Sequence, residues 1–417
     1  MNRILYLSIL LLLSYNALKA QTVECFVLTA PETRLTEIKR LSVLDFSGEK
    51  GRQLTDYLIV ELMKTDRGIK SISGGLFSAA KEGKTFQKGA RTNLYSVVER
   101  DQIDKVLKEQ NFSNSGIVDD AQATQIGKVL GIDAIISGSV SYTSKDEQSE
   151  TTTYDLSGKA SSVPCLKRTV TAEARIRIIS VTTGLVIGVC SPKAEFYERK
   201  CGSERSGIQS AAAIANACYQ DLAFKLANSF SPYFKNVKFE FEKIKTKEFK
   251  DKSKLALDYI ESSDFDKAAN IYKAILEADP YTAAAAYNLG CLNTIVGNYD
   301  EAYQYYKTAA EIDEAAFGQY VKKAEAQVEM NKILQAMGIS IEKQGFESTT
   351  AALADKIKTR GNKSDRFDAR EKPDGSSASV ARIPGDTEFT VIKRDGDWYL
   401  IKLLGGKQGY INQTFVK

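Results

Sequence analysis

The fold of the first half of the chain follows from residues 94–142, LYSVVERDQIDKVLKEQNFSNSGIVDDAQATQIGKVLGIDAIISGSVSY. This stretch opens with a short β-branched run, Leu94 to Val98, which is typical of a strand. The next apolar residues, Ile103, Val106 and Leu107, recur with helical spacing and lie on one face. The change from a period of two to a period of 3.6 predicts a strand that leads directly into a helix.

The flanking segments extend this pattern. A second helix is expected from Asp119, whose carboxylate can cap the first amides, to Gly131, which ends it. Ala134 to Val140 then reads as a strand, and upstream Arg40 to Phe46 and Gln53 to Met63 read as a strand and a helix. The sequence therefore predicts a mixed domain, α/β or α+β, with two or three layers.

Two further strands and a long helix are expected after residue 167. Arg168 to Val181 alternates between apolar and polar residues, so one face of this strand is covered. The turn Thr182 to Gly184 returns the chain as a hairpin through Leu185 to Tyr197. Ser206 to Phe230 is alanine-rich with helical periodicity, and it suits a helix packed across the sheet.

Three blocks of the sequence resemble a known family. In order they read YSVVERDQIDKVLKEQ, IGKVLGIDAIISGSV and VTAEARIRIISVTTGLVIG. Together they resemble the curli production assembly/transport component (CsgG-like) family over about Lys39 to Ser231. The resemblance implies a periplasmic domain that assembles into rings. In some members it also implies two β-hairpins that insert into the outer membrane as a secretion pore.

The residues of this chain argue against a pore and a lipid anchor. Residues 142–167 contain few apolar side chains, and residues 191–207 are charged and too short for two spanning strands. Pore-forming members of the family look to be lipoproteins, whereas Cys25 follows Thr22, Val23 and Glu24 rather than small residues. We expect the protein to be at most peripheral to the outer membrane.

The first twenty residues predict export. Arg3 precedes an apolar run too short to span a bilayer, and Lys19-Ala20 before Gln21 suits a cleavage site. A buried helix is the weaker alternative, because the segment has no polar face. We expect a cleaved signal peptide over residues 1–20 and a periplasmic location.

Composition disfavours catalysis and nucleic-acid binding. The formal charge is +4 over 417 residues, and there is no histidine to act as a general base or metal ligand. Ser78 to Thr85 imitates a phosphate-binding loop but lacks its first glycine and its leading strand, so we interpret it as a solvated loop. We expect a protein that is not an enzyme, with no cofactor and no metal.

Six cysteines in an exported chain permit disulfides. If Val181 pairs with Leu185 across the hairpin turn, paired residues sum to 366 and Cys165 lies opposite Cys201. These two are the candidate disulfide. Two prolines in the same segments oppose this register, and free thiols are the alternative.

The second half contains a repeat with a period of 34 residues. The matching pairs are Leu255 and Leu289, Ala256 and Gly290, Phe265 and Tyr299, Ala268 and Ala302, and Tyr272 and Tyr306. They resemble a pair of tetratricopeptide repeats, which a third helix over Phe317 to Met337 should cap. Asn236 to Lys254 reads as a connector before them. The repeats either form a peptide groove, with Tyr287 as a candidate lining residue, or serve as a spacer.

The C-terminal segment reads as short strands broken by turns. Phe346 to Asp365 is polar and is expected to be a linker. The wording GDWYLIK and GYI then resembles a bacterial SH3-like barrel, which implies binding of peptides or cell-wall material. Trp398, Tyr399 and Tyr410 are candidate binding residues, although we favour a core position for Trp398.

The sequence thus predicts a modular, non-enzymatic envelope scaffold. Its parts are a signal peptide (1–20), a curli-transport-like domain (21–235), helical repeats (249–340) and an SH3-like domain (365–417). Expected partners are envelope proteins, including other copies of the chain in a ring, and peptidoglycan. The alternatives are a regulator of peptidoglycan synthesis, which would copurify with a synthase, and a subunit of an outer-membrane secretion pore.

Overall fold

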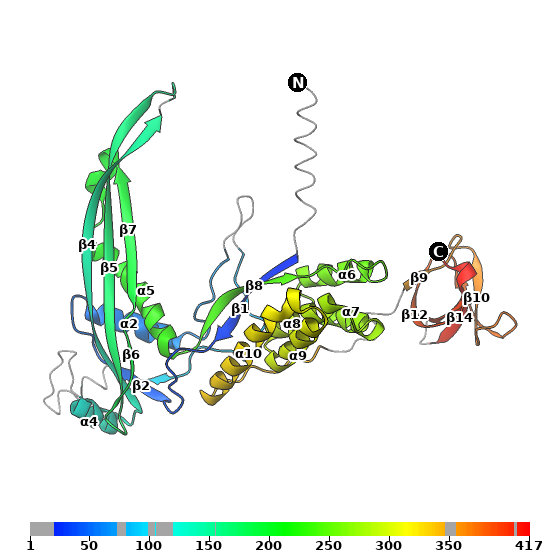
Figure 1. Ribbon diagram of the computed structural model, residues 1–417, viewed down its shortest axis with the longest axis horizontal. Helices are drawn as coiled ribbons and strands as arrows, with labels where there is room; N and C mark the ends of the chain where they lie inside the picture. The colour runs from blue at the N-terminus through cyan, green and yellow to red at the C-terminus, as the bar shows by residue number, and fades with distance from the viewer. Residues whose placement is uncertain are drawn as a thin grey trace.

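The protein has a mixed sheet-and-helix region, a helical middle region and an all-β C-terminal sheet (Figure 1). The computed structural model describes residues 21–72, 81–98, 105, 120–154, 156–346, 356–403 and 407–417. The expected signal peptide, all but residue 105 of the helix around Ile103 to Leu107, and the first three residues of the loop that imitates a phosphate-binding motif (78–80) lie outside these residues. Across the described part, no helix is long and apolar enough to cross a membrane.

The first sheet runs in the order β3-β2-β4-β5-β6, and β7 also pairs with β5. Strand β2 is parallel to β3 and β4, whereas the other pairs are antiparallel. The expected β-α-β start is therefore present. The strands are β2 (Arg40–Val43), β3 (Ser96–Val97), β4 (Ala134–Tyr154), β5 (Ala160–Ser180), β6 (Val186–Cys190) and β7 (Lys193–Cys201).

Strands β4 and β5 form one long hairpin. Each has 21 residues, and they pair without interruption from Ala134 opposite Ser180 to Tyr154 opposite Ala160. The sequence pattern predicted strands only over 134–140 and 168–181. In Figure 1 the hairpin reaches well beyond the helices that cover its base.

Helices cover both faces of the base of this sheet. Helix α2 (Gly51–Met63) buries Leu54, Leu58 and Leu62, whose spacing of four residues puts them on one face, and it packs beside α5 (Ala211–Phe230). Helix α4 (Asp120–Leu130) covers the opposite face at the base.

Helix α5 begins five residues later than Ser206, the start that the sequence suggested. Residues Gly202–Gly207 form a 3-10 helix instead. The Gln209 amide then donates to the Glu198 carboxylate, and Ser210 is extended and accepts from the Ala213 amide as the N-cap. These bonds hold the chain off the helical path until Ala211.

The expected connector after residue 236 is wrong at its start. Strand β8 (Tyr233–Phe241) pairs antiparallel with β1 (Gln21–Thr29), which the sequence analysis missed. Phe239 and Phe241 are buried among the helices, while Lys238 and Glu240, which alternate with them, are exposed. This period of two marks a strand that is covered on one face, and lysine-rich composition concealed it.

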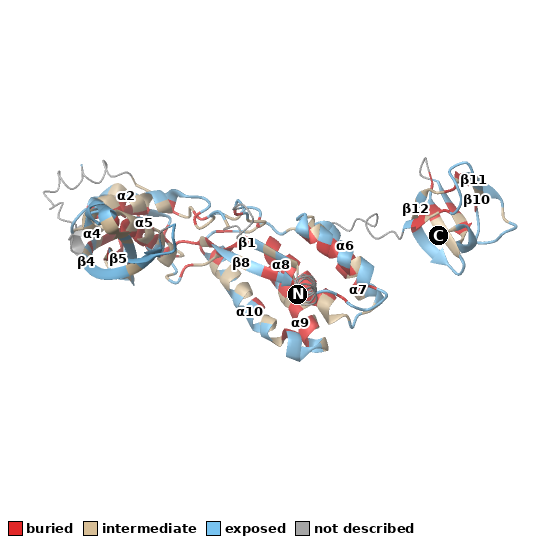
Figure 2. Cartoon of the chain, turned by 90° about the horizontal axis from the view of Figure 1, so that it is seen from above, coloured by how far each residue is buried: buried red, intermediate tan, exposed pale blue. Residues whose placement is uncertain are grey.

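The middle region is built from five helices, which run one after another and share one core with β1 and β8 (Figure 2). They are α6 (Lys250–Glu261), α7 (Phe265–Ala278), α8 (Ala283–Val296), α9 (Tyr299–Ile312) and α10 (Glu314–Ala336). Gly290 lets α8 approach α9, because a Cβ there would lie 2.7 Å from the Tyr306 ring. The expected third helix is α10.

The C-terminal sheet has the order β11-β10-β14-β13-β12-β9. Its strands are β9 (Lys356–Lys358), β10 (Arg366–Arg370), β11 (Ser379–Pro384), β12 (Glu388–Asp395), β13 (Trp398–Lys402) and β14 (Gln408–Asn412), followed by a 3-10 turn (Gln413–Phe415). Ile383, Ile401 and Ile411 form its core with residues from the other strands. Strand β9 lies inside the expected linker, so that interpretation is wrong for residues 356–358.

Candidate functional site

The residues named from the sequence lie in three places: the Cys165 and Cys201 pair on β5 and β7, the groove of the helical region, and the two faces of the C-terminal sheet. The outer edge of the main sheet is a further surface, which the sequence did not indicate. Within the described ranges, no group of three or more Cys, Asp or Glu side chains is placed to hold a metal ion.

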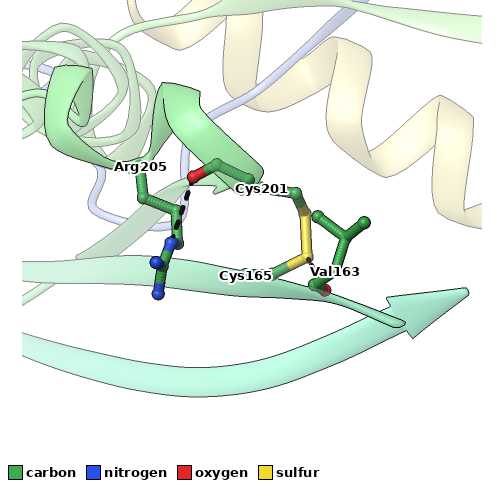
Figure 3. Close-up of a disulfide and its surroundings, with 5 residues drawn as sticks. Val163, Cys165, Cys201 and Arg205 are labelled. Carbon is green, nitrogen blue, oxygen red and sulfur yellow. Dashed lines mark hydrogen bonds between the residues drawn. A yellow bond between two sulfur atoms is a disulfide. The ribbon is translucent and has the colours of Figure 1, made fainter. Parts of the chain in front are cut away.

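Cys165 on β5 and Cys201 on β7 form a disulfide (Figure 3). They are opposite each other in the sheet, in the register that the hairpin arithmetic gave. The bond closes a sequence separation of 36 residues, for which loop entropy alone predicts a stabilisation of about 4 kcal/mol. It fixes the end of β7 against the long hairpin, where the 3-10 turn begins and Arg205 donates to the Gly202 carbonyl.

The outer edge of the main sheet is apolar. Strand β6 reads VIGVC and, among the described residues, pairs only with β5. Leu185 and Val189 are 64% and 66% exposed, and Val186 and Ile187 also face solvent. Edge strands are usually protected by lysine, proline or a covering loop, because their free amides and carbonyls invite pairing. Strand β6 contains no lysine or proline, and no strand among the described residues pairs with its outer side, although Thr33 lies against Gly188 on one face.

The distal hairpin is polar. From Thr143 to Thr153 the β4 side chains are mostly exposed hydroxyl, amide and charged groups. Arg168 on β5 donates two hydrogen bonds, of 2.8 and 2.6 Å, to the carboxylate of Asp146 opposite it on β4, and these bonds lower the pKa of Asp146. This is the polar composition from which the sequence predicted that the segment does not form a membrane pore.

Tyr287 lies in the groove of the helical region, where this chain's own strand β8 occupies part of the space. The Tyr287 hydroxyl donates to the Glu240 carbonyl at 3.0 Å. Next to it, Asn288 accepts from the Glu242 amide at 2.9 Å and donates to the Glu242 carbonyl at 2.8 Å. Helix α8 therefore holds the backbone of an extended segment, and the sequence analysis named Tyr287 but missed Asn288.

A cavity remains beside this contact. Its volume is about 260 Å³, and it lies between β8 and helices α8, α9 and α10. The rings of Tyr287, Tyr306 and Tyr320 line it, with centroids 4.7 to 5.9 Å apart. Lys323 lies at its lining and is exposed. The cavity is apolar and aromatic inside, with a cation at its margin.

The aromatic residues of the C-terminal sheet divide between its two faces. Tyr399 packs against the core, with the Arg394 guanidinium 5.3 Å from its ring centroid. Trp398 and Tyr410 alternate with the core residues and are half-buried on the other face, so the preferred core position for Trp398 is wrong. Because paired residues share a face, Arg370 opposite Tyr410 joins them.

Two family models match separate parts of the chain. The family model described as curli production assembly/transport component CsgG matches residues 86–225. The bacterial SH3 domain model matches residues 368–417. The chain contains a CsgG domain and a bacterial SH3 domain. The helical region lies between the two matches.

Several solved structures are similar over part of the chain. The LpoB C-terminal domain from Salmonella enterica is 11% identical, covering 43% of this chain and 86% of its own, with a TM-score of 0.20. Lipoprotein GNA1162 from Neisseria meningitidis is 14% identical, with coverages of 46% and 99% and a TM-score of 0.21. The PelC dodecamer from Paraburkholderia phytofirmans is 11% identical, with coverages of 49% and 98% and a TM-score of 0.16. No curated protein sequence matches.

Proposed function

We propose that this protein is an exported, non-enzymatic scaffold of the bacterial envelope. In this role the CsgG domain associates with further copies of itself in a curli-type secretion or envelope complex. The helical region and the SH3 domain then recruit a second protein or the cell wall. The two family matches support the class of protein, and the open apolar edge of β6 is the observation that carries self-association.

The edge suits a second copy for a physical reason. An exposed strand offers a row of free backbone groups, and pairing with another strand satisfies them. Leu185 and Val189 are already about one third covered, so burying the rest of each side chain contributes about 1 to 2 kcal/mol. Self-association through β6 therefore adds hydrophobic burial to backbone pairing.

The SH3 domain supplies a separate binding face. Tyr410 is paired with Arg370, and Trp398 lies on the same face; both rings are half-buried, and the Arg370 guanidinium donates to the Ser377 carbonyl. Aromatic and arginine side chains dominate the energy of many protein interfaces. We assign this face to an envelope protein or peptidoglycan, and we interpret the helical region as tetratricopeptide repeats that provide a second contact.

A non-enzymatic role agrees with the chemistry of the available side chains. The sequence has no histidine. Burial raises the pKa of the Cys190 and Cys291 thiols to about 11, and that of Cys25 to about 12. Protonated thiols are poor nucleophiles, so these cysteines suit packing better than catalysis.

The test is the mass of the protein in detergent-free solution. We expect light scattering of the chain from Gln21 onward to give a multimer, and Val189→Glu to shift it to monomer. Ile392→Glu is the matched control, because Ile392 is 46% exposed on the SH3 domain. A monomeric wild-type protein, or an equal response to the two substitutions, would overturn self-association through β6.

A further inference from the structure

The ribbon formed by β1 and β8 has one edge that is only partly used. In an antiparallel pair, alternate residues direct both backbone groups away from the partner strand. The outward set is identified by three bonds: the Phe26 amide to the Lys84 carbonyl, the Phe234 amide to the Arg67 carbonyl, and Tyr287 to the Glu240 carbonyl. The even-numbered residues of both strands therefore point outward.

This assignment leaves a gap on the outer edge of β8. Its ends are held, at Phe234 by Arg67 and at Glu240 by Tyr287. Between them, the outward backbone groups of Asn236 and Lys238 have no hydrogen-bond partner among the residues that the structure describes. Residues 237–240 of β8 line the aromatic cavity. The free backbone groups therefore lie beside the cavity.

The cavity complements the edge. A strand added to β8 would direct the side chain opposite Phe239 to the same face as Phe239, which is the face toward the helices. On that face lie Tyr287, Tyr306 and Tyr320, with room for one large side chain. Aromatic pairs favour centroid separations like those already present among the three rings.

The charge beside the cavity also indicates which kind of ligand binds there. Lys323 is exposed, its ammonium lies 5.1 Å from the centroid of the Tyr320 ring, and it forms no salt bridge with any described carboxylate. Lys238, in contrast, is paired with Glu240 at 3.2 Å. An unpaired cation beside an aromatic cavity favours a ligand with a carboxylate next to its apolar group.

We propose that the gap between β8 and α10 binds an extended peptide that adds to the free edge at Asn236 and Lys238. The peptide places an aromatic side chain among the tyrosines and an acidic side chain at Lys323. This inference names the class of partner for the helical region, and it rests on the recruiting role proposed above. It does not depend on self-association of the CsgG domain.

The probe is a fluorescein-labelled hexapeptide, Thr-Thr-Tyr-Thr-Asp-Thr, amidated at its C-terminus. Its Tyr and Asp are two residues apart, so both point to one face of a strand. We expect saturable binding to the full chain, measured by fluorescence anisotropy. Replacing the peptide's Tyr with Ser, or methylating its alternate backbone amides, should weaken binding by about tenfold or more.

Two variants of the protein test the location. Lys238→Pro removes an outward amide and puts a ring on the edge, but it leaves the pairing with β1 intact, so binding should be lost. Glu24→Pro is its matched control, because Glu24 faces Lys238 across the ribbon and points to the other edge. Lys323→Glu should weaken binding by about tenfold, whereas Lys322→Glu, on an exposed neighbour, should not.

The outcomes separate the two proposals. If Lys238→Pro and Lys323→Glu both bind the peptide as tightly as the wild-type protein does, the proposed edge site is overturned. It is also overturned if the wild-type protein does not bind the peptide at millimolar concentration. The same samples are measured by light scattering, where the variants should keep the wild-type mass. A multimer that binds no peptide would overturn this inference alone, and a monomer that binds peptide would overturn self-association alone.

Discussion

The two β-ribbons of this protein are stabilised in opposite ways. The β1–β8 ribbon buries one face among the helices, with Phe239 and Phe241 in the core. The distal part of the β4–β5 hairpin has solvent on both faces and few apolar side chains. A two-stranded ribbon is marginal in water by itself, so the second one needs other support. Strand β7 and the disulfide provide it as far as Cys165.

The largest expected effect comes from removing the hydrophobic support of the first ribbon. Phe241 is fully buried, and Phe241→Ala should lower the free energy of unfolding by about 3 to 5 kcal/mol, because it leaves a cavity. Urea denaturation followed by circular dichroism measures this change. Glu240→Ala on the same strand is the control, and a similar loss in both variants would contradict the one-faced ribbon.

The disulfide is the corresponding test of the second ribbon. The double variant Cys165→Ala, Cys201→Ala should lose up to about 4 kcal/mol of stability. We expect the loss of amide-exchange protection to concentrate in β7 and the distal half of β5. Cys190→Ala, which removes a free thiol, is the control. Unchanged protection near residue 165 would show that backbone pairing alone holds the hairpin.

The polar contact that anchors the first ribbon should have a smaller effect. Asn288→Ala removes two part-buried hydrogen bonds, to the Glu242 amide and to the Glu242 carbonyl, and their loss together costs about 1 to 3 kcal/mol. Tyr287→Phe removes one hydrogen bond to Glu240 and should cost about 0.5 to 1.5 kcal/mol. Thermal unfolding ranks the two, and the reverse order would contradict the role of Asn288 as the main anchor.

The contrast between the ribbons also explains which features the sequence could predict. Arg168 to Val181 alternates cleanly, and the register of its hairpin is enough to put Cys165 opposite Cys201. Residues 143–153 have no such pattern, because no layer covers them, so the length of β4 was missed. Strand β8 does alternate, at Val237, Phe239 and Phe241, but the lysines and glutamates between them suggested a connector.

The candidate sites, too, were predictable only where a local sequence pattern marks them. The side chains of Trp398, Tyr399 and Tyr410 were visible in the sequence, but which face each occupies depends on the pairing of β13 with β14. The groove was placed at Tyr287 from the repeat pattern. Its occupation by β8 depends on contacts between residues about 46 positions apart, which no local pattern records.

The smallest expected effect is the pH dependence of the distal hairpin. Hydrogen bonds from Arg168 lower the pKa of Asp146 below its ordinary value of 3.8, so the folded hairpin favours the charged carboxylate. This contribution is complete above pH 3.8 and is lost as the pH falls through the lowered pKa. Asp146 is solvent-exposed and Arg168 is only half-buried, so the effect on global stability is slight. Amide exchange of β4 around Asp146 measures this contribution. The exchange rates are compared between wild-type protein and Asp146→Asn as the pH is lowered from 5 to 3. The difference between the two proteins should shrink toward pH 3, because the protonated aspartic acid resembles asparagine. A difference that stays constant from pH 5 to pH 3 would show that the charge of Asp146 does not contribute to the stability of the hairpin.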